Sequence, residues 1–162
     1  MQVTPINTKL QYASYHREHK MSESFSGGCL CGAVRYQCAV APVGAGHCHC
    51  NDCRKSSGTG HCSHLVVPAA ALEVTGKVTF FESPTDAGNT VGRAFCPTCG
   101  SPVYSKNSSL PDLLFPRASS LDNLEVFQPQ MVVYAKRAAS WDRLDQTLPH
   151  FEEMPPKGVP GT

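Results

Sequence analysis

Seven of the nine cysteines in this chain lie in three short clusters whose spacing suits a metal ion. The clusters are Cys29-Leu30-Cys31, Cys48-His49-Cys50-Asn51-Asp52-Cys53 and Cys96-Pro97-Thr98-Cys99. A disulfide would not form comfortably within one cluster, because it requires a narrow range of Cα separations and side-chain directions. Thiolates at these spacings can instead converge on one soft cation, and tetrahedral Zn²⁺ is the usual occupant. Three clusters together strongly predict zinc binding.

The spacing alone leaves open which clusters share an ion. On an extended backbone Cys29 and Cys31 would lie on one face, as two ligands of the same ion must. The spacing of Cys50-x-x-Cys53 and Cys96-x-x-Cys99 would also suit a shared ion, as in a zinc ribbon.

The length and composition of the chain exclude several classes of protein. The chain has 162 residues, a net charge of +1 and 17% charged residues, so we expect one domain and neither nucleic-acid nor membrane binding. No apolar run approaches the roughly 20 residues of a membrane span. The first 20 residues lack the apolar region of a secretory signal. Clustered cysteines, odd in number, then indicate a reduced, cytoplasmic protein that binds metal.

Three segments are expected from the pattern along the chain. Residues 1–24 are polar and without clear periodicity, which predicts a flexible N-terminal extension. Residues 25–154 carry the clusters and the apolar runs, and we interpret them as the zinc domain. Residues 155–162 form a C-terminal tail.

Short apolar runs separated by turns predict a mainly β domain of short antiparallel strands. Val34, Tyr36 and Cys38 alternate with polar residues, the period of a half-buried strand, and Cys38 is expected to be a small buried hydrophobe. Residues 61–67 predict another strand, in which Cys62 is assigned to packing. Further strands are expected near residues 74–76, 78–81, 91–95, 103–104, 113–115 and 131–134.

Two short helices are expected as well. One would begin at Asn51, with Asn51 or Asp52 as its N-cap, and would end at the glycines of Gly58–Gly60. The other is predicted near the C-terminus, where Leu144, Leu148 and Phe151 follow at spacings close to the helical period.

The motifs together resemble the glutathione-dependent formaldehyde-activating enzyme family, which also includes the domain of centromere protein V. The resemblance rests on Gly28–Tyr36, Cys48–Arg54, Phe95–Ser101 and the ending from Trp141 through Leu148-Pro149-His150-Phe151. It runs from about residue 25 to residue 154.

This resemblance implies a β-tent fold with two zinc ions per chain. It also implies a partition of the ligands that spacing alone leaves open. The structural site would be formed by Cys29, Cys31, Cys96 and Cys99. The site associated with activity, with three thiolates, would be formed by Cys48, Cys50 and Cys53.

The two sites would differ in chemistry. Zinc with four thiolates is closed and stabilises the fold, whereas zinc with three keeps one position for a ligand. A small thiol bound there, glutathione in this family, would be ionised and would attack formaldehyde to give S-(hydroxymethyl)glutathione. The reverse step cleaves a carbon–sulfur bond. The sequence therefore predicts a zinc-dependent carbon–sulfur lyase or synthase, and the natural thiol and aldehyde stay open.

Two other classes remain possible from the sequence: a non-catalytic zinc-stabilised binding module, which the lack of a basic region disfavours, and a metal or redox sensor. Four histidines also lie near the central cluster in sequence: His47, His49, His61 and His64. One of them could be a fourth ligand or a proton shuttle, although hydrogen-bonded or exposed histidines are more common. Arg54 and Lys55 could meet a glutathione carboxylate. None of these six residues is assigned a catalytic role.

Overall fold

The computed structural model describes residues 24–156, so most of the expected N-terminal extension and C-terminal tail lies outside the described part. The division into three segments therefore stays a prediction. Within residues 24–156 no helix is long and apolar enough to cross a membrane.

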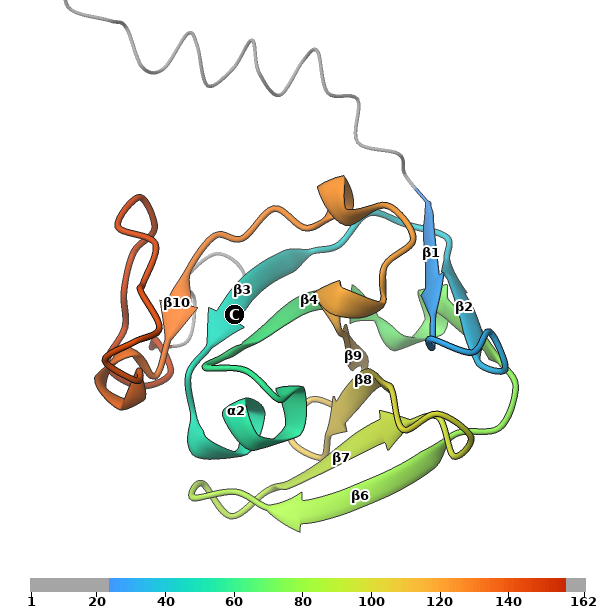
Figure 1. Ribbon diagram of the computed structural model, residues 1–162, viewed down its shortest axis with the longest axis horizontal. Coiled ribbons are helices and arrows are strands. Elements are labelled where there is room, and N and C mark those ends of the chain that lie inside the picture. Colours follow the sequence, from blue (N-terminus) through green and yellow to red (C-terminus); the bar gives the residue numbers. More distant parts are fainter. Residues whose placement is uncertain (1–23, 157–162) are drawn as a thin grey trace, which may run out of the picture.

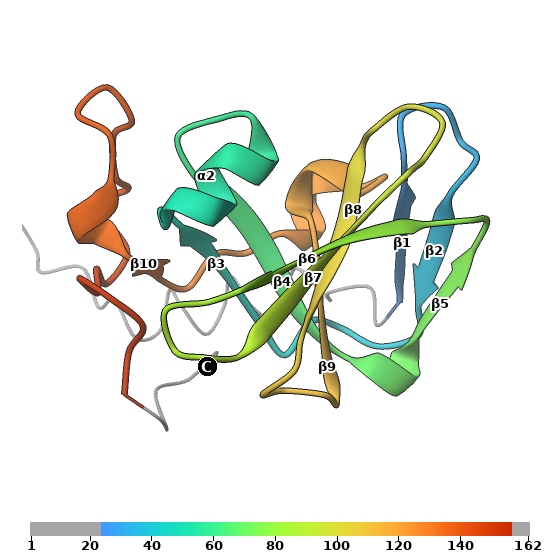
Figure 2. The same cartoon turned by 90° about the horizontal axis from the view of Figure 1, so that it is seen from below.

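A three-stranded antiparallel sheet forms one end of the molecule (Figures 1 and 2). Its strand order is β1 (Phe25–Gly28), β2 (Arg35–Cys38) and β5 (Leu72–Thr75). Val34, Tyr36 and Cys38 are each at most 1% exposed, so the alternation read from the sequence does mark a buried face, and the assignment of Cys38 to the core is confirmed.

A seven-stranded sheet carries the rest of the chain, in the order β10-β3-β4-β9-β8-β7-β6. All neighbours are antiparallel except β10 and β3, which are parallel. The strands are β3 (Gly44–Cys48), β4 (Cys62–Pro68), β6 (Thr79–Pro84), β7 (Thr90–Phe95), β8 (Pro102–Asn107), β9 (Leu113–Pro116) and β10 (Val132–Val133). The expectation of a mainly β fold with short strands is confirmed.

The main core lies between the two sheets. From the small sheet it takes Phe25, Tyr36 and Leu72, and from the large sheet Leu65 and Val67 of β4, both fully buried. Because side chains alternate along a strand, the other β4 residues, Cys62, His64 and Val66, face the opposite side of the sheet. The candidate site lies on that opposite side.

Helical structure in the described residues is limited to short elements. They are α2 (Asn51–Ser57) and the 3₁₀ turns η1 (Ala69–Ala71), η2 (Ala118–Ser120), η3 (Leu124–Val126) and η4 (Ala135–Arg137). The helix predicted near the C-terminus is wrong. Phe151 instead donates its backbone N–H to Val132 O at 2.8 Å, and Val132 donates to Pro149 O at 3.0 Å. Pairing with β10, together with the missing N–H of Pro149, keeps this segment extended.

The predicted helix after the central cluster is present, but its cap differs from the prediction. The N-cap is Cys50, whose Sγ accepts a hydrogen bond from the Cys53 N–H at 3.3 Å. Gly58, at φ 75°, ends the helix as expected. Preferred N-cap residues accept the hydrogen bond with a side-chain oxygen, so the sequence favoured Asn51 or Asp52. Cysteine is not expected as a cap because its sulfur is a weak acceptor.

Gly27 provides a test of how tightly the small sheet is packed. A methyl group at Gly27 would overlap the Ser120 carbonyl and the Tyr36 hydroxyl, which belong to well-buried residues. Gly27→Ala should therefore lower the free energy of unfolding by about 1–3 kcal/mol through overpacking. Urea denaturation measures the change. Gln37→Ala is the control, because Gln37 lies in the neighbouring strand β2 and its side chain is exposed. Equal stability of the two variants would contradict the packing described here.

Candidate metal centres and pocket

Two loops of similar construction bring four of the predicted ligands together. Cys29 and Cys31 follow β1, and Cys96 and Cys99 follow β7. Each pair is followed directly by a glycine in the left-handed region, Gly32 at φ 77° and Gly100 at φ 73°. These glycines close tight turns, donating N–H groups to Cys29 O at 3.1 Å and Cys96 O at 2.8 Å. The turns direct both cysteine pairs toward the space between the loops.

The four sulfur atoms have the spacing of a closed tetrathiolate site. All lie within 4.8 Å of one another, with Cys29–Cys31 at 3.6 Å and Cys31–Cys96 at 3.8 Å. Zn–S bonds of about 2.3 Å in a tetrahedron require sulfur–sulfur distances of roughly 3.8 Å. The Val34 N–H also donates to Cys29 Sγ at 3.2 Å, as expected for a stabilised thiolate. These residues fit a zinc ion without rearrangement of either loop.

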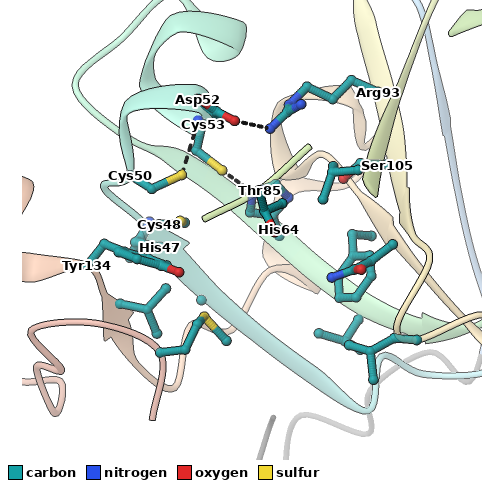
Figure 3. Close-up of a pocket in the computed structure, with 18 of the residues that line it drawn as sticks. His47, Cys48, Cys50, Asp52, Cys53, His64, Thr85, Arg93, Ser105 and Tyr134 are labelled. Atoms are coloured by element: carbon teal, nitrogen blue, oxygen red, sulfur yellow. Dashed lines mark hydrogen bonds and ion pairs between the residues drawn. The ribbon is translucent and has the colours of Figure 1, made fainter. Parts of the chain in front are cut away.

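The other three predicted ligands form a separate group. Cys48 ends β3, Cys50 caps α2, and Cys53 lies in the first turn of that helix; their sulfurs lie within 4.8 Å of one another (Figure 3). Hydrogen bonds from Cys48 and Cys53 lower the pKa of Cys50, while the same interaction with Cys50 raises the pKa of Cys48. The group thus favours a thiolate even before a cation is considered. Cys50 and Cys53 are not grouped with Cys96 and Cys99, so the zinc-ribbon combination is not formed.

The three-sulfur group lies at the edge of a pocket of about 280 Å³. This pocket occupies the face of the seven-stranded sheet opposite the main core. Segments far apart in sequence line it, from β3 and β4 through β7, β8 and β9 to the chain after β10. Its polar lining includes Arg137. It also includes the residues His47, His64, Arg93, Ser105 and Tyr134, which are labelled in Figure 3. The volume suits a small molecule, and the sulfurs are accessible to it.

Arg117 supplies a buried positive charge at this pocket. It is 2% exposed, and among residues 24–156 no carboxylate lies within ion-pair distance of it. Its guanidinium donates to Cys62 Sγ and, at 3.3 Å, to Ser56 Oγ, while Nε has no partner. By contrast, the lining residue Arg93 is paired with Asp52 at 3.1 Å. A buried, unneutralised guanidinium favours anions nearby.

His64 lies between Arg117 and the three-sulfur group. Its Nε2 is 3.5 Å from Cys53 Sγ and 3.4 Å from Arg117 Nη1. Burial, and secondly the charge of Arg117, lower the pKa of His64 to about 3. The imidazole is therefore neutral at physiological pH, and it separates the buried cation from the sulfurs without adding charge.

Tyr134 has an unusual backbone conformation at the same pocket. It is the sole described non-glycine residue with a positive φ, 56°, and its side chain lines the cavity with the hydroxyl directed inward (Figure 3). The left-handed region costs a tyrosine on the order of 1 kcal/mol or more. Burial raises the pKa of Tyr134, so its hydroxyl stays protonated and can donate a hydrogen bond. Strain of this kind is concentrated at functional sites.

Three other residues considered in the sequence analysis, Arg54, Lys55 and Cys62, do not line the pocket. Arg54 donates to Asn51 Oδ1 at 3.3 Å, Lys55 is exposed, and neither lines the pocket. Cys62 is 4% exposed and packs against Arg117, in agreement with the packing assignment. Arg117 and Tyr134 were not singled out, because no local motif marks them; an isolated Arg after a Pro and a Tyr after two valines carry no signal of a shared pocket.

Comparisons with known proteins found a family model, a relative and a solved structure that resemble this chain. A family model described as "Glutathione-dependent formaldehyde-activating enzyme" matches residues 24–137. A protein of Halomonas elongata, named for the same enzyme, is 32% identical over 102 residues, which are 60% of this chain and 65% of that protein. The chain thus spans just under two thirds of that relative's length. A crystal structure of a Rhodobacter sphaeroides protein superposes with a TM-score of 0.49 and 22% identity, over 60% of this chain and 88% of the other.

The family match includes all seven clustered cysteines, both loops of the four-sulfur group and the strands that form the pocket. The expected resemblance is confirmed: this chain is a member of the glutathione-dependent formaldehyde-activating enzyme family.

Proposed function

We propose that the chain makes and breaks the carbon–sulfur bond between a small thiol and formaldehyde, acting as an S-(hydroxymethyl)glutathione synthase or lyase. The observation that carries this proposal is the group of three sulfurs that lines a small-molecule pocket, whereas the separate four-sulfur group does not line it. Glutathione is the thiol that the family description indicates. The proposed cofactor is zinc, two ions per chain, and the proposed location is the cytoplasm.

The reaction balances without an additional reactant. The thiol sulfur forms a bond to the carbonyl carbon of formaldehyde, and the π electron pair of the carbonyl moves to oxygen. That oxygen takes up a proton, so overall the hydrogen of the thiol ends on the new hydroxymethyl group. The reverse reaction breaks the same carbon–sulfur bond and returns the proton to the thiol.

Cys48, Cys50 and Cys53 would hold the zinc ion at the pocket. When bound there, zinc supplies an open coordination position that favours an ionised thiol. The buried charge of Arg117 acts in the same direction, because an uncompensated guanidinium favours negative charge in the pocket. Binding in the pocket holds the thiol and the aldehyde in contact, so the entropy cost of bringing them together is met by binding and not in the chemical step.

Tyr134 is proposed to donate a hydrogen bond to the aldehyde oxygen, where negative charge develops as the carbon–sulfur bond forms. Tyr134→Phe removes only the hydroxyl and keeps the ring and the backbone conformation. We expect kcat to fall on the order of 100-fold, with little change in thermal stability. Tyr104→Phe is a matched control, since Tyr104 lies in the main core. Equal loss in both variants, or none in Tyr134→Phe, would contradict the proposed role.

The proposed activity is tested by magnetisation-exchange NMR with ¹³C-formaldehyde and glutathione. The purified protein should accelerate exchange between free formaldehyde and the glutathione adduct well above the uncatalysed rate. S-methylglutathione, which has no free thiol, should show no exchange. An uncatalysed rate with glutathione, together with tight binding of the adduct, would instead identify a carrier or binding module.

A further inference from the structure

A second cluster of metal-binding side chains lies behind the three-sulfur group. Cys48 and Cys50 direct their sulfurs toward one another, and the residue between them, His49, points to the other side of the chain. There it meets His61, which precedes β4, and Asp142, from the segment after η4. The ring centroids of the two histidines are 5.0 Å apart. The backbone of residues 48–50 therefore separates two potential sites.

The three potential ligand atoms have a spacing close to that of a coordinated ion. Asp142 Oδ2 lies 2.8 Å from His61 Nδ1 and 3.4 Å from His49 Nδ1, and all three atoms lie within 4.8 Å of one another. Bonds of about 2.0 Å to a tetrahedral zinc would place ligand atoms roughly 3.3 Å apart. The distance from Asp142 to His49 already matches this value, and the distance from Asp142 to His61 is about 0.5 Å shorter.

His49 distinguishes this cluster from an ordinary His–Asp hydrogen bond. Its side chain is only 2% exposed, and its Nδ1 is buried without a hydrogen-bond partner, although it faces the carboxylate. The hydrogen bond between His61 and Asp142 leaves this nitrogen unsatisfied, and a buried polar atom without a partner destabilises the fold. An ion coordinated by all three atoms would satisfy it. The neighbouring His47 is already engaged, because its Nδ1 pairs with Ser63 Oγ at 2.9 Å.

The chain also provides room for the carboxylate. Gly60 is buried against Asp142, and a methyl group at this position would overlap the Asp142 carboxylate. A turn in which Asp142 donates its backbone N–H to Ala139 O at 2.9 Å presents that carboxylate to the histidines. Glycine at position 60 leaves space for the Asp142 carboxylate, and the turn at Ala139 holds that carboxylate in place.

We propose that His49, His61 and Asp142 form a third metal site, for a divalent transition ion that prefers imidazole, with zinc as the simplest occupant. Two nitrogens and one carboxylate oxygen suit Zn²⁺ and leave one position for water. The ion would link the segment after η4 to the chain on either side of α2. This site is distinct from both cysteine groups and does not depend on the proposed reaction.

The test measures zinc content at fixed free zinc. Purified full-length protein is equilibrated with a weak zinc buffer at micromolar free metal, and bound zinc is measured by elemental analysis. Wild type should hold one more zinc per chain than either His61→Ala or Asp142→Asn. Asp112→Asn, an exposed aspartate before β9, is the control and should keep the wild-type content.

Crystals of the zinc-loaded wild type provide a second measurement that requires no variant. An anomalous difference map at the zinc edge should show a peak within bonding distance of His49 Nδ1, His61 Nδ1 and Asp142 Oδ2. Equal zinc content in wild type and both variants, or no peak between these atoms, would overturn the proposal. Extra zinc bound elsewhere on the chain would survive both variants and would also count against it. Loss of glutathione-dependent activity has no bearing on either result.

Discussion

Cys99→Ala should leave the protein largely insoluble, because it removes one ligand from the group that joins the two sheets. Cys29 and Cys31 follow β1 of the small sheet, whereas Cys96 and Cys99 follow β7 of the large one. Structural zinc contributes apparent binding free energies of about 10–16 kcal/mol in small zinc domains. That range is comparable to the whole stability of a typical domain, about 5–15 kcal/mol. Weakening this site should therefore unfold the chain.

Soluble yield and zinc content of the purified protein measure this effect. Wild type should contain about two zinc ions if the cysteine groups alone are filled, and a third if the histidine site is occupied as well. Cys38→Ala is the matched control, since Cys38 is a buried core cysteine outside both groups and its loss should cost only a packing defect. A soluble, well-folded Cys99→Ala protein would show that this group does not hold the fold together.

Cys50→Ala should have the opposite profile, remaining folded but losing activity. The ligands Cys48, Cys50 and Cys53 are close in sequence, so an ion bound to them closes only a short loop and contributes less to the fold. We expect one zinc ion fewer than in wild type, no thiol binding and exchange of formaldehyde at the uncatalysed rate.

Cys50 is also the N-cap of α2, so alanine removes two interactions at once. Loss of a cap costs about 1 kcal/mol, which should lower the melting temperature by a few degrees. Cys50→Ser separates the effects, because its hydroxyl can cap the helix but is a poor zinc ligand. The serine variant should recover stability without recovering activity. If Cys50→Ala collapses while Cys99→Ala stays folded, the structural and active groups are reversed.

Much of the fold could be predicted because its signals are local. Alternation at Val34, Tyr36 and Cys38 reflects a backbone period of two, and a strand with one buried face must show it. The seven clustered cysteines were also identifiable, since close spacing is itself the chemical signal. Spacing does not determine how these cysteines divide between two ions. The family resemblance implied that division, and in the structure the sulfurs lie in one group of four and one group of three.

The features that could not be predicted depend on contacts between residues far apart in the sequence, which leave no local sequence pattern. The predicted C-terminal helix had plausible spacing, yet Phe151 pairs with β10 because that strand offers its backbone groups. Arg117 and Tyr134 reach the pocket from segments more than 50 residues after Cys50. Asp142 lies 81 residues from His61, so only the folded chain reveals that they meet.

The left-handed backbone at Tyr134 has a consequence for how variants of this protein would be selected. Glycine and asparagine adopt this conformation more readily than tyrosine, so a library screened only for heat resistance has no reason to retain the tyrosine hydroxyl. A library screened for formaldehyde turnover should retain tyrosine at the same position. The two screens should therefore diverge at this residue, because thermal stability and catalysis impose different demands on one side chain.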